Sequence, residues 1–160
     1  MSHLHKDHAG GVSFRNYTGN YKLAFENAVY FVQEKEYEYA LDTGYPSYFT
    51  DEFDVLYRNS QVVWLTEDEG IIDNYIHYKI TGAHSKYHQV FWIKEGGENV
   101  FFGGDDAPQH QQMISRFVAK YDFDGKKCME LRQQWWQQGK EEQWTFLFYH
   151  DIKLPYFKQP

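Results

Sequence analysis

Four side chains that commonly bind metal ions lie within the first eight residues of the chain, and two glycines follow them. These residues are His3, His5, Asp7 and His8, followed by Gly10 and Gly11. In an extended segment alternate side chains share a face, so His3, His5 and Asp7 are expected to point one way. A turn after them would bring His8 alongside, and the glycines allow the backbone to turn tightly. Imidazole and carboxylate groups bind zinc, iron and similar ions. The alternative is a solvated arm or an expression tag, although a tag would normally be an unbroken run of one residue.

The composition is typical of one globular domain over residues 1–160. Of the 160 residues, 42% are hydrophobic and 24% are charged, which is enough for a sizeable buried core. The formal net charge of -7 argues against a nucleic-acid partner, because phosphate binding needs a basic face. No apolar run approaches the roughly 20 residues of a membrane helix, so no membrane partner is expected. The only cysteine, Cys128, cannot form an internal disulfide, which fits a reducing compartment and predicts a cytoplasmic protein.

The order of strand and helix signals predicts an α/β layered domain. Strand segments are rich in β-branched and aromatic residues, whereas helical segments carry apolar residues at helical spacing. We expect strands at 28–32, 62–65, 75–80, 89–93, 100–102 and 144–149, and helices at 34–41, 46–58, 108–121 and 125–138. Three residues with metal-binding side chains, His84, Asp105 and His150, come shortly after expected strands. Open α/β sheets place their functional sites at such strand ends.

The opening motif and several later segments together resemble the metallo-β-lactamase-fold superfamily. "SHLHKDHAGG" matches its His-x-His-x-Asp-His pattern and the two glycines that follow. "TGAHSKYHQVFWI" is similar to the segment with a metal-binding histidine, so His84 takes the ligand position and His88 a supporting one. "VFFGGDDAP" resembles the strand that ends in a bridging aspartate, "KYDFDGKKCMELR" the stretch that leads into a helix, and "WTFLFYHDIKLP" the closing strand with the final histidine. The resemblance extends from Ser2 to about Pro155 and implies an αββα sandwich.

The resemblance also implies a site for two divalent metal ions, expected to be zinc, with iron or manganese as alternatives. One ion would be bound by His3, His5 and His84, and the other by Asp7, His8 and His150. Asp105 would bridge the two ions, together with a water or hydroxide. Two ions about 3.5–4 Å apart acidify such a water and polarise a carbonyl or phosphoryl oxygen. Asp7 is also the expected catalytic residue, because its carboxylate can orient the water and accept or return a proton.

Two parts of the sequence depart from the family pattern. Ser85, Lys86 and Tyr87 replace the small Thr-Pro-Gly turn, and these side chains either contact an anionic or aromatic substrate or lie on the surface. Asp106 directly follows Asp105, which leaves a one-residue ambiguity in the bridge, although the Gly-Gly-Asp register favours Asp105.

Other residues with reactive or bulky side chains are expected to be structural. Asp122 and Asp124 should begin a helix, where aspartate accepts hydrogen bonds from unpaired backbone amides. The tryptophan pair at 135–136 lies in an amphipathic helix, which favours packing over substrate contact. Two histidines outside the motifs, His77 and His110, are expected to be ordinary strand or surface residues.

The position of the motif predicts that the chain is the C-terminal portion of a longer metallohydrolase. In the resembling family a β-rich half precedes the motif, whereas here only Met1 and Ser2 come before His3. The sandwich would then lack its N-terminal strands, and Met1 would be the last residue of the strand that enters the loop. Exposed strand edges and an apolar sheet face would favour oligomers or the binding of the missing segment. A naturally short, rearranged variant is the alternative.

These observations predict a metal-dependent hydrolase that acts on an ester, lactone, thioester or related bond of a small molecule. The later segments resemble the lactonase-like branches more than the true β-lactamases. A second hypothesis is an iron-dependent oxidoreductase on the same scaffold, and a third is an inactive truncated remnant that binds metal. The substrate itself is left open, because loops around the site determine specificity.

Overall fold

In the computed structural model, which describes residues 1–159, the chain divides into two compact units. The first unit contains Met1 and His3–Thr66, and the second contains Ser2 and the residues from Glu67 onward. The prediction of a single domain over residues 1–160 stays a prediction.

The first unit combines short strands with helices around an aromatic-rich core. Its elements are α1 (Lys6–Ala9), β1 (Ser13–Arg15), β2 (Tyr21–Leu23), β3 (Tyr30–Gln33), α2 (Glu34–Thr43), α3 (Thr50–Phe53), the 3-10 helix η1 (Asp54–Leu56) and β4 (Val62–Leu65). Strands β1 and β2 form an antiparallel hairpin, which the sequence analysis did not predict. Strands β3 and β4 pair in parallel, with α2 in the connection between them. The buried core includes Leu4 from the histidine motif, which anchors that motif to the unit.

Helix α2 begins and ends where its sequence signals place it. The side chain of Gln33 accepts a hydrogen bond from the Lys35 amide, and acidic residues fill the first turn, where they suit the positive end of the helix. Gly44 ends the helix with a φ of 63°, in the left-handed region that favours glycine. Glu36, Tyr37 and Ala40 are buried, so this helix turns one carboxylate into the interior.

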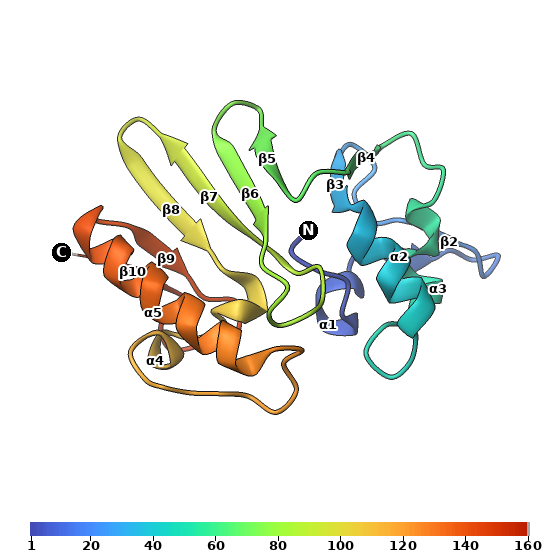
Figure 1. The fold of residues 1–160 in the computed structure, drawn as a ribbon. Helices are drawn as coiled ribbons and strands as arrows, with labels where there is room; N and C mark the ends of the chain where they lie inside the picture. The colour runs from blue at the N-terminus through green and yellow to red at the C-terminus, as the bar shows by residue number, and fades with distance from the viewer. Residues whose placement is uncertain (160) are drawn as a thin grey trace. The chain divides into compact units, whose positions relative to one another are not determined.

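The second unit is a six-stranded sheet with one long helix. Its elements are β5 (Glu69–Ile72), β6 (Ile76–Ile80), β7 (Gln89–Glu95), β8 (Glu98–Phe102), the 3-10 helix η2 (Gly104–Asp106), α4 (His110–Met113), α5 (Gly125–Glu141), β9 (Thr145–Leu147) and β10 (Tyr156–Lys158). The strand order is β10-β9-β8-β7-β6-β5, and every pair is antiparallel except β8 and β9. That parallel pair is joined through α5, shown in orange in Figure 1.

Helix α5 packs against the sheet through aromatic side chains, as the sequence predicted for the tryptophan pair. The Trp135 ring lies 4.8 Å from the Phe101 ring, and the Trp136 ring lies 5.3 Å from the Phe146 ring, between centroids. Gly139 allows the close approach, because a Cβ atom there would lie 2.4 Å from the Phe146 ring. Within residues 1–159, no helix combines the length and the apolar character that crossing a membrane requires.

Two of the expected helices are much shorter than predicted. Residues 46–58 form only α3 and η1, and residues 108–121 form only the four-residue helix α4. The apolar residues that suggested a helix over 108–121 are largely exposed, so they do not form a buried stripe. Backbone groups at the end of this segment instead bond to another loop: the amides of Phe123 and Asp124 donate to the carbonyls of His84 and Ala83. Tertiary hydrogen bonds here outweigh the local helical pattern.

Candidate metal centre

The histidine motif of the first unit forms a short extended segment that runs into one turn of helix. His5 has an extended conformation (φ -57°, ψ 149°), and its carbonyl accepts hydrogen bonds from the amides of His8 and Ala9. Helix α1 begins at Lys6, so the expected extended arrangement of His3, His5 and Asp7 is wrong at Asp7. The helical turn places Asp7 and His8 next to each other, with 3.7 Å between Asp7 Oδ2 and His8 Nε2.

The rings of the motif lie close together. The centroid of the His3 ring is 4.6 Å from that of His5 and 4.1 Å from that of His8. His3 is buried, and its ligand nitrogen and that of His5 lie within 4.8 Å of each other. Imidazole rings clustered in this way offer nitrogen donors that suit zinc and similar ions.

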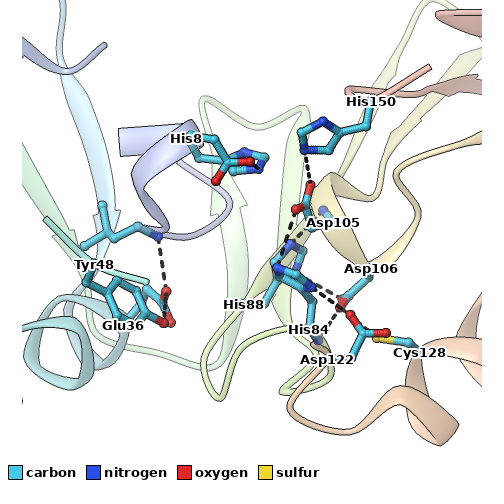
Figure 2. A network of polar contacts seen from close by, with 12 residues as sticks. His8, Glu36, Tyr48, His84, His88, Asp105, Asp106, Asp122, Cys128 and His150 are labelled. Carbon is cyan, nitrogen blue, oxygen red and sulfur yellow. Dashed lines mark hydrogen bonds and ion pairs between the residues drawn. The ribbon is translucent and has the colours of Figure 1, made fainter. Parts of the chain in front are cut away.

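A buried carboxylate in α2 holds the backbone of the motif. The Leu4 amide donates to Glu36 Oε1 at 3.1 Å, and the Tyr48 hydroxyl donates to the same oxygen at 3.3 Å. Glu36 and Tyr48 lie beside each other at the left of Figure 2. The Lys6 amide donates to the Ser47 carbonyl at 3.0 Å. Gly10 is needed for packing, because a Cβ atom there would lie 2.7 Å from the Lys6 carbonyl oxygen. The sequence analysis did not identify Glu36, since a glutamate in a helix is normally exposed.

In the second unit, the carboxylate of Asp105 lies between two imidazole rings. Asp105 Oδ2 is 3.4 Å from His84 Nε2, and Asp105 Oδ1 is 3.2 Å from His150 Nε2. Figure 2 shows the three side chains pointing toward one another from the loop after β6, from η2 and from the segment after β9. Each carboxylate oxygen therefore faces one imidazole nitrogen, which is the arrangement of a group that could bridge two cations.

The loop that carries Asp105 is held by His88. The Asp105 amide donates to His88 Nε2 at 3.1 Å, so this nitrogen is an acceptor and the proton of the neutral ring is on Nδ1. His88 Nδ1 lies 3.1 Å from Asp106 Oδ2, which accepts that proton in a hydrogen bond. Gly104 has a φ of 51°, and a Cβ atom there would lie 2.7 Å from His88 Nε2, so only glycine fits. His88 thus supports the loop, as the resemblance implied.

Asp106 is a buried anchor, and its side chain does not face the imidazoles of His84 and His150 that flank Asp105. Its carboxylate accepts hydrogen bonds from the His84 amide at 2.7 Å and from the Thr81 hydroxyl at 2.5 Å. The Cys128 thiol in α5 lies 3.6 Å from Asp106 Oδ1. Burial tends to raise the pKa of Asp106, but the contacts with His88, Thr81 and the His84 amide outweigh burial and lower it. Asp105 is therefore the acidic residue of the pair that faces the two imidazoles.

Asp122 contacts His84, which corrects its expected role at a helix start. The Asp122 side chain is only 2% exposed, and its Oδ1 lies 2.8 Å from His84 Nδ1. Asp124 does begin α5, because its carboxylate accepts a hydrogen bond from the Lys127 amide at 3.0 Å. Burial tends to lower the pKa of His84, but the hydrogen bond to Asp122 and the nearby carboxylates of Asp105 and Asp106 raise it overall. No local pattern distinguishes Asp122 from Asp124, so only the tertiary structure assigns them different roles.

The residues that replace the Thr-Pro-Gly turn lie in the loop between β6 and β7. Ser85 is buried, whereas Lys86 is exposed, with its ammonium 5.4 Å from the centroid of the Tyr87 ring. The Tyr121 ring, which the sequence analysis did not single out, lies 5.9 Å from the His84 ring. Burial raises the pKa of the Tyr121 hydroxyl, and the carboxylates of Asp122 and Asp105 add to this effect.

The remaining histidines lie outside these two groups. His77 is in β6, and His110 begins α4, where its ring contacts Trp136 and Phe157 at centroid distances of 5.4 Å and 4.9 Å. His110 therefore packs against the aromatic side of α5 and β10.

The fold matches solved structures of hydrolases. A probable metal-dependent hydrolase from Staphylococcus aureus is similar to 99% of this chain, with a TM-score of 0.81 and 24% identity. An N-acyl homoserine lactone hydrolase, solved with the product N-hexanoyl-L-homoserine at its catalytic metal centre, is similar to 95% of this chain (TM-score 0.68, 25% identity). The hydrolase AbOPH of the beta lactamase superfamily is similar to 99% of the chain (TM-score 0.67, 22% identity). The chain therefore has part of the fold of the metallo-β-lactamase superfamily.

The match covers nearly all of this chain but only part of each similar protein. The chain spans 56%, 54% and 62% of the lengths of those three proteins, so it corresponds to part of a metallo-β-lactamase sandwich. No family model matches the sequence, and no curated protein matches it either. The expected α/β fold class and the family resemblance are confirmed by the fold.

Proposed function

We propose that this chain carries the metal-binding site of a metal-dependent hydrolase that cleaves a lactone or a related ester bond. The observation that carries the proposal is the placement of Asp105, whose two carboxylate oxygens face His84 Nε2 and His150 Nε2. At 3.4 Å and 3.2 Å these contacts are longer than charge-assisted hydrogen bonds, which are about 2.7–2.9 Å. Here the carboxylate of Asp105 and the rings of His84 and His150 direct lone pairs toward one another. Cations bound between them would accept these lone pairs.

The proposed ligands of the two ions are those that the family resemblance implies. In this proposal His3, His5 and His84 hold one ion, Asp7, His8 and His150 hold the other, and Asp105 bridges them. The support is found within each unit: the clustered rings of the motif in the first, and the paired contacts of Asp105 in the second. Nitrogen and oxygen ligands of this kind fit zinc, and iron or manganese would also be accepted.

In the proposed reaction Asp7 handles the proton and Asp105 helps to hold the ions. When bound, two divalent cations acidify a shared water and polarise the carbonyl of the substrate. Asp7 has a side chain that is 53% exposed, so its carboxylate can orient the attacking water, accept its proton and return that proton to the leaving oxygen. The Asp105 amide is held by His88, and the His84 amide by the buried carboxylate of Asp106, so these two side chains are presented from anchored loops.

A lactone is the proposed substrate class because one similar protein is a lactone hydrolase solved with its product at the metal centre. Ring opening of a lactone needs a single activated water and leaves the alcohol and the acid in one molecule. The substrate would be a small molecule, as is the product bound at the metal centre of that similar lactone hydrolase.

The test measures metal content and lactone hydrolysis in the full chain. Protein purified without chelators is expected to contain two zinc ions per chain and to open N-acyl homoserine lactones. Asp105→Asn should lose both metal and turnover, because the bridging charge is removed while the size of the side chain is kept. Asp42→Asn, at an exposed position of α2, is the matched control and should change neither.

Three results would contradict the proposal. A single iron ion with no hydrolysis would favour the oxidoreductase alternative. Equal metal content in the Asp105 and Asp42 variants would exclude Asp105 as a ligand. A wild-type chain that folds but neither binds metal nor hydrolyses lactones would be the inactive remnant.

A further inference from the structure

Asp122 is placed so that it controls one nitrogen of a proposed metal ligand. Its Oδ1 lies 2.8 Å from His84 Nδ1, while the other nitrogen of that ring, Nε2, faces Asp105. Figure 2 shows the Asp122 carboxylate beside the His84 ring on the side away from Asp105. We propose that Asp122 is the positioning residue that orients His84 for metal binding, an inference that rests on the proposed function.

The buried carboxylate of Asp122 needs a partner, and its contact with His84 provides one. The Asp122 side chain is 2% exposed, and its Oδ2 has no hydrogen-bond partner among residues 1–159. A buried carboxylate is costly unless it is hydrogen-bonded and its charge is compensated. The hydrogen bond with His84 offsets part of the cost of burying the Asp122 charge. A cation bound to His84 would offset more of that cost.

The backbone holds the two side chains in register. The Phe123 amide donates to the His84 carbonyl at 3.0 Å, and the Asp124 amide donates to the Ala83 carbonyl at 2.8 Å. These bonds flank the contact between the Asp122 and His84 side chains. Because the backbones are joined independently, the carboxylate of Asp122 is not needed to connect the two segments. Its placement against Nδ1 is therefore a separate feature.

The contact determines which nitrogen of His84 carries the proton. A carboxylate accepts hydrogen bonds, so His84 Nδ1 carries a proton and donates it to Asp122. The neutral ring then has its lone pair on Nε2, which is the nitrogen that faces Asp105 at 3.4 Å. Hydrogen bonding of the outer nitrogen to a carboxylate fixes the ring orientation of a metal-bound histidine and increases its basicity. Asp122 would act on the metal only through His84.

The neighbouring pair of Asp106 and His88 has a different purpose. His88 Nε2 accepts the Asp105 amide, so both nitrogens of His88 are used within the protein. In His84 only Nδ1 is directed to a carboxylate outside the proposed ligand set. Of these two aspartate–histidine pairs, Asp122 and His84 are thus the one arranged to present a nitrogen to an ion.

The first experiment reads the tautomer of His84 by nitrogen NMR in the metal-free full chain, at a pH where the ring is neutral. The wild-type protein should show the proton on Nδ1. In Asp122→Asn the amide group can donate to Nδ1 instead, which would move the proton to Nε2, the wrong tautomer for binding. A wild-type ring with its proton on Nε2 would overturn the inference, and this measurement does not depend on whether the variant folds.

The second experiment measures zinc affinity by competition with a chelator. Asp122→Asn is expected to weaken binding by about 10- to 100-fold, the usual effect of removing such an outer partner. Asp124→Asn is the matched control, since Asp124 caps α5 two residues away and asparagine caps helices equally well. The control should keep the wild-type affinity and tautomer.

The outcomes separate this inference from the proposed function. If the wild type binds no divalent metal ion, the proposed function fails, and the tautomer measurement alone decides whether Asp122 sets the position of the proton on His84. If the wild type binds zinc and both variants bind it equally, the inference fails while the proposed function stands. If Asp122→Asn loses affinity and changes the tautomer while thermal unfolding is unchanged, Asp122 positions His84.

Discussion

The histidine motif of the first unit and the three candidate ligands of the second unit are held by different means. In the motif, His3, His5, Asp7 and His8 are close in sequence, and one turn of helix after His5 arranges them locally. In the second unit, His84, Asp105 and His150 come from distant segments and depend on a buried polar network. The motif is therefore ordered mainly by its own turn, with Glu36 as its buried carboxylate anchor. The distant ligands are held by two buried carboxylates, Asp106 and Asp122, together with His88.

This difference predicts that substitution of supporting residues destabilises the second unit more than the first. Four changes test it, in order of decreasing expected effect.

Asp106→Ala should have the largest effect on stability. The substitution leaves the His84 amide, the Thr81 hydroxyl and His88 Nδ1 without their buried acceptor. Removing one partner from a buried charged network costs about 3–5 kcal/mol, and the free energy of unfolding in urea should fall by that amount. Asp42→Ala, which removes an exposed carboxylate, is the control. If the two variants unfold at the same urea concentration, Asp106 is not the anchor of the network.

Gly104→Ala should be the next most disruptive. The new methyl group would approach His88 Nε2 to 2.7 Å at a φ of 51°, so the loop that carries Asp105 must shift. Overpacking of this kind costs about 1–3 kcal/mol, and zinc affinity should fall with it. Gly11→Ala is the control in the first unit, because nothing lies within 4 Å of a Cβ atom there. Calorimetry should show a lower melting temperature for the Gly104 variant only.

Glu36→Ala tests the anchor of the histidine motif. The Leu4 amide would lose its buried acceptor, which costs about 1–3 kcal/mol. Because the turn at α1 is held by its own backbone bonds, the motif should keep part of its order. Glu38→Ala, at an exposed position of the same helix, should leave chemical denaturation unchanged. If Glu36→Ala lowers the free energy of unfolding as much as Asp106→Ala does, the contrast between the two units is wrong.

Cys128→Ala should have the smallest effect. The thiol makes one weak contact of 3.6 Å with Asp106 Oδ1, so about 1 kcal/mol or less is expected from its loss. Burial raises the pKa of the Cys128 thiol, and the nearby carboxylates of Asp106 and Asp122 add to this effect. The native wild-type protein should therefore resist alkylation, measured by mass spectrometry, until denaturant opens the second unit. Rapid labelling of the folded chain would show that the face of α5 that carries Cys128 is accessible in the native protein.

Much of the fold followed from local sequence patterns. Strands β6 to β9 of the large sheet, the Asp124 cap of α5 and the packing of the tryptophan pair followed from strand composition, a capping residue and helical spacing, whereas β5 and β10 were not predicted. Residues 108–121 show where this reasoning fails. Their apolar spacing resembles a helix, but the segment is largely irregular and ends in backbone bonds to Ala83 and His84. A pattern within one segment carries no information on such distant partners.

The sequence by itself determined the candidate metal ligands, because a motif of spaced histidines and aspartates is a local property of the chain. Only the tertiary structure decided which carboxylates support them. Asp105 and Asp106 are adjacent in sequence, yet one faces two imidazoles and the other anchors a loop. Asp122 and Asp124 differ in the same way, since one contacts His84 and the other caps a helix. The reason is physical: a hydrogen bond depends on the direction and burial of both partners, which arise only when distant segments pack together.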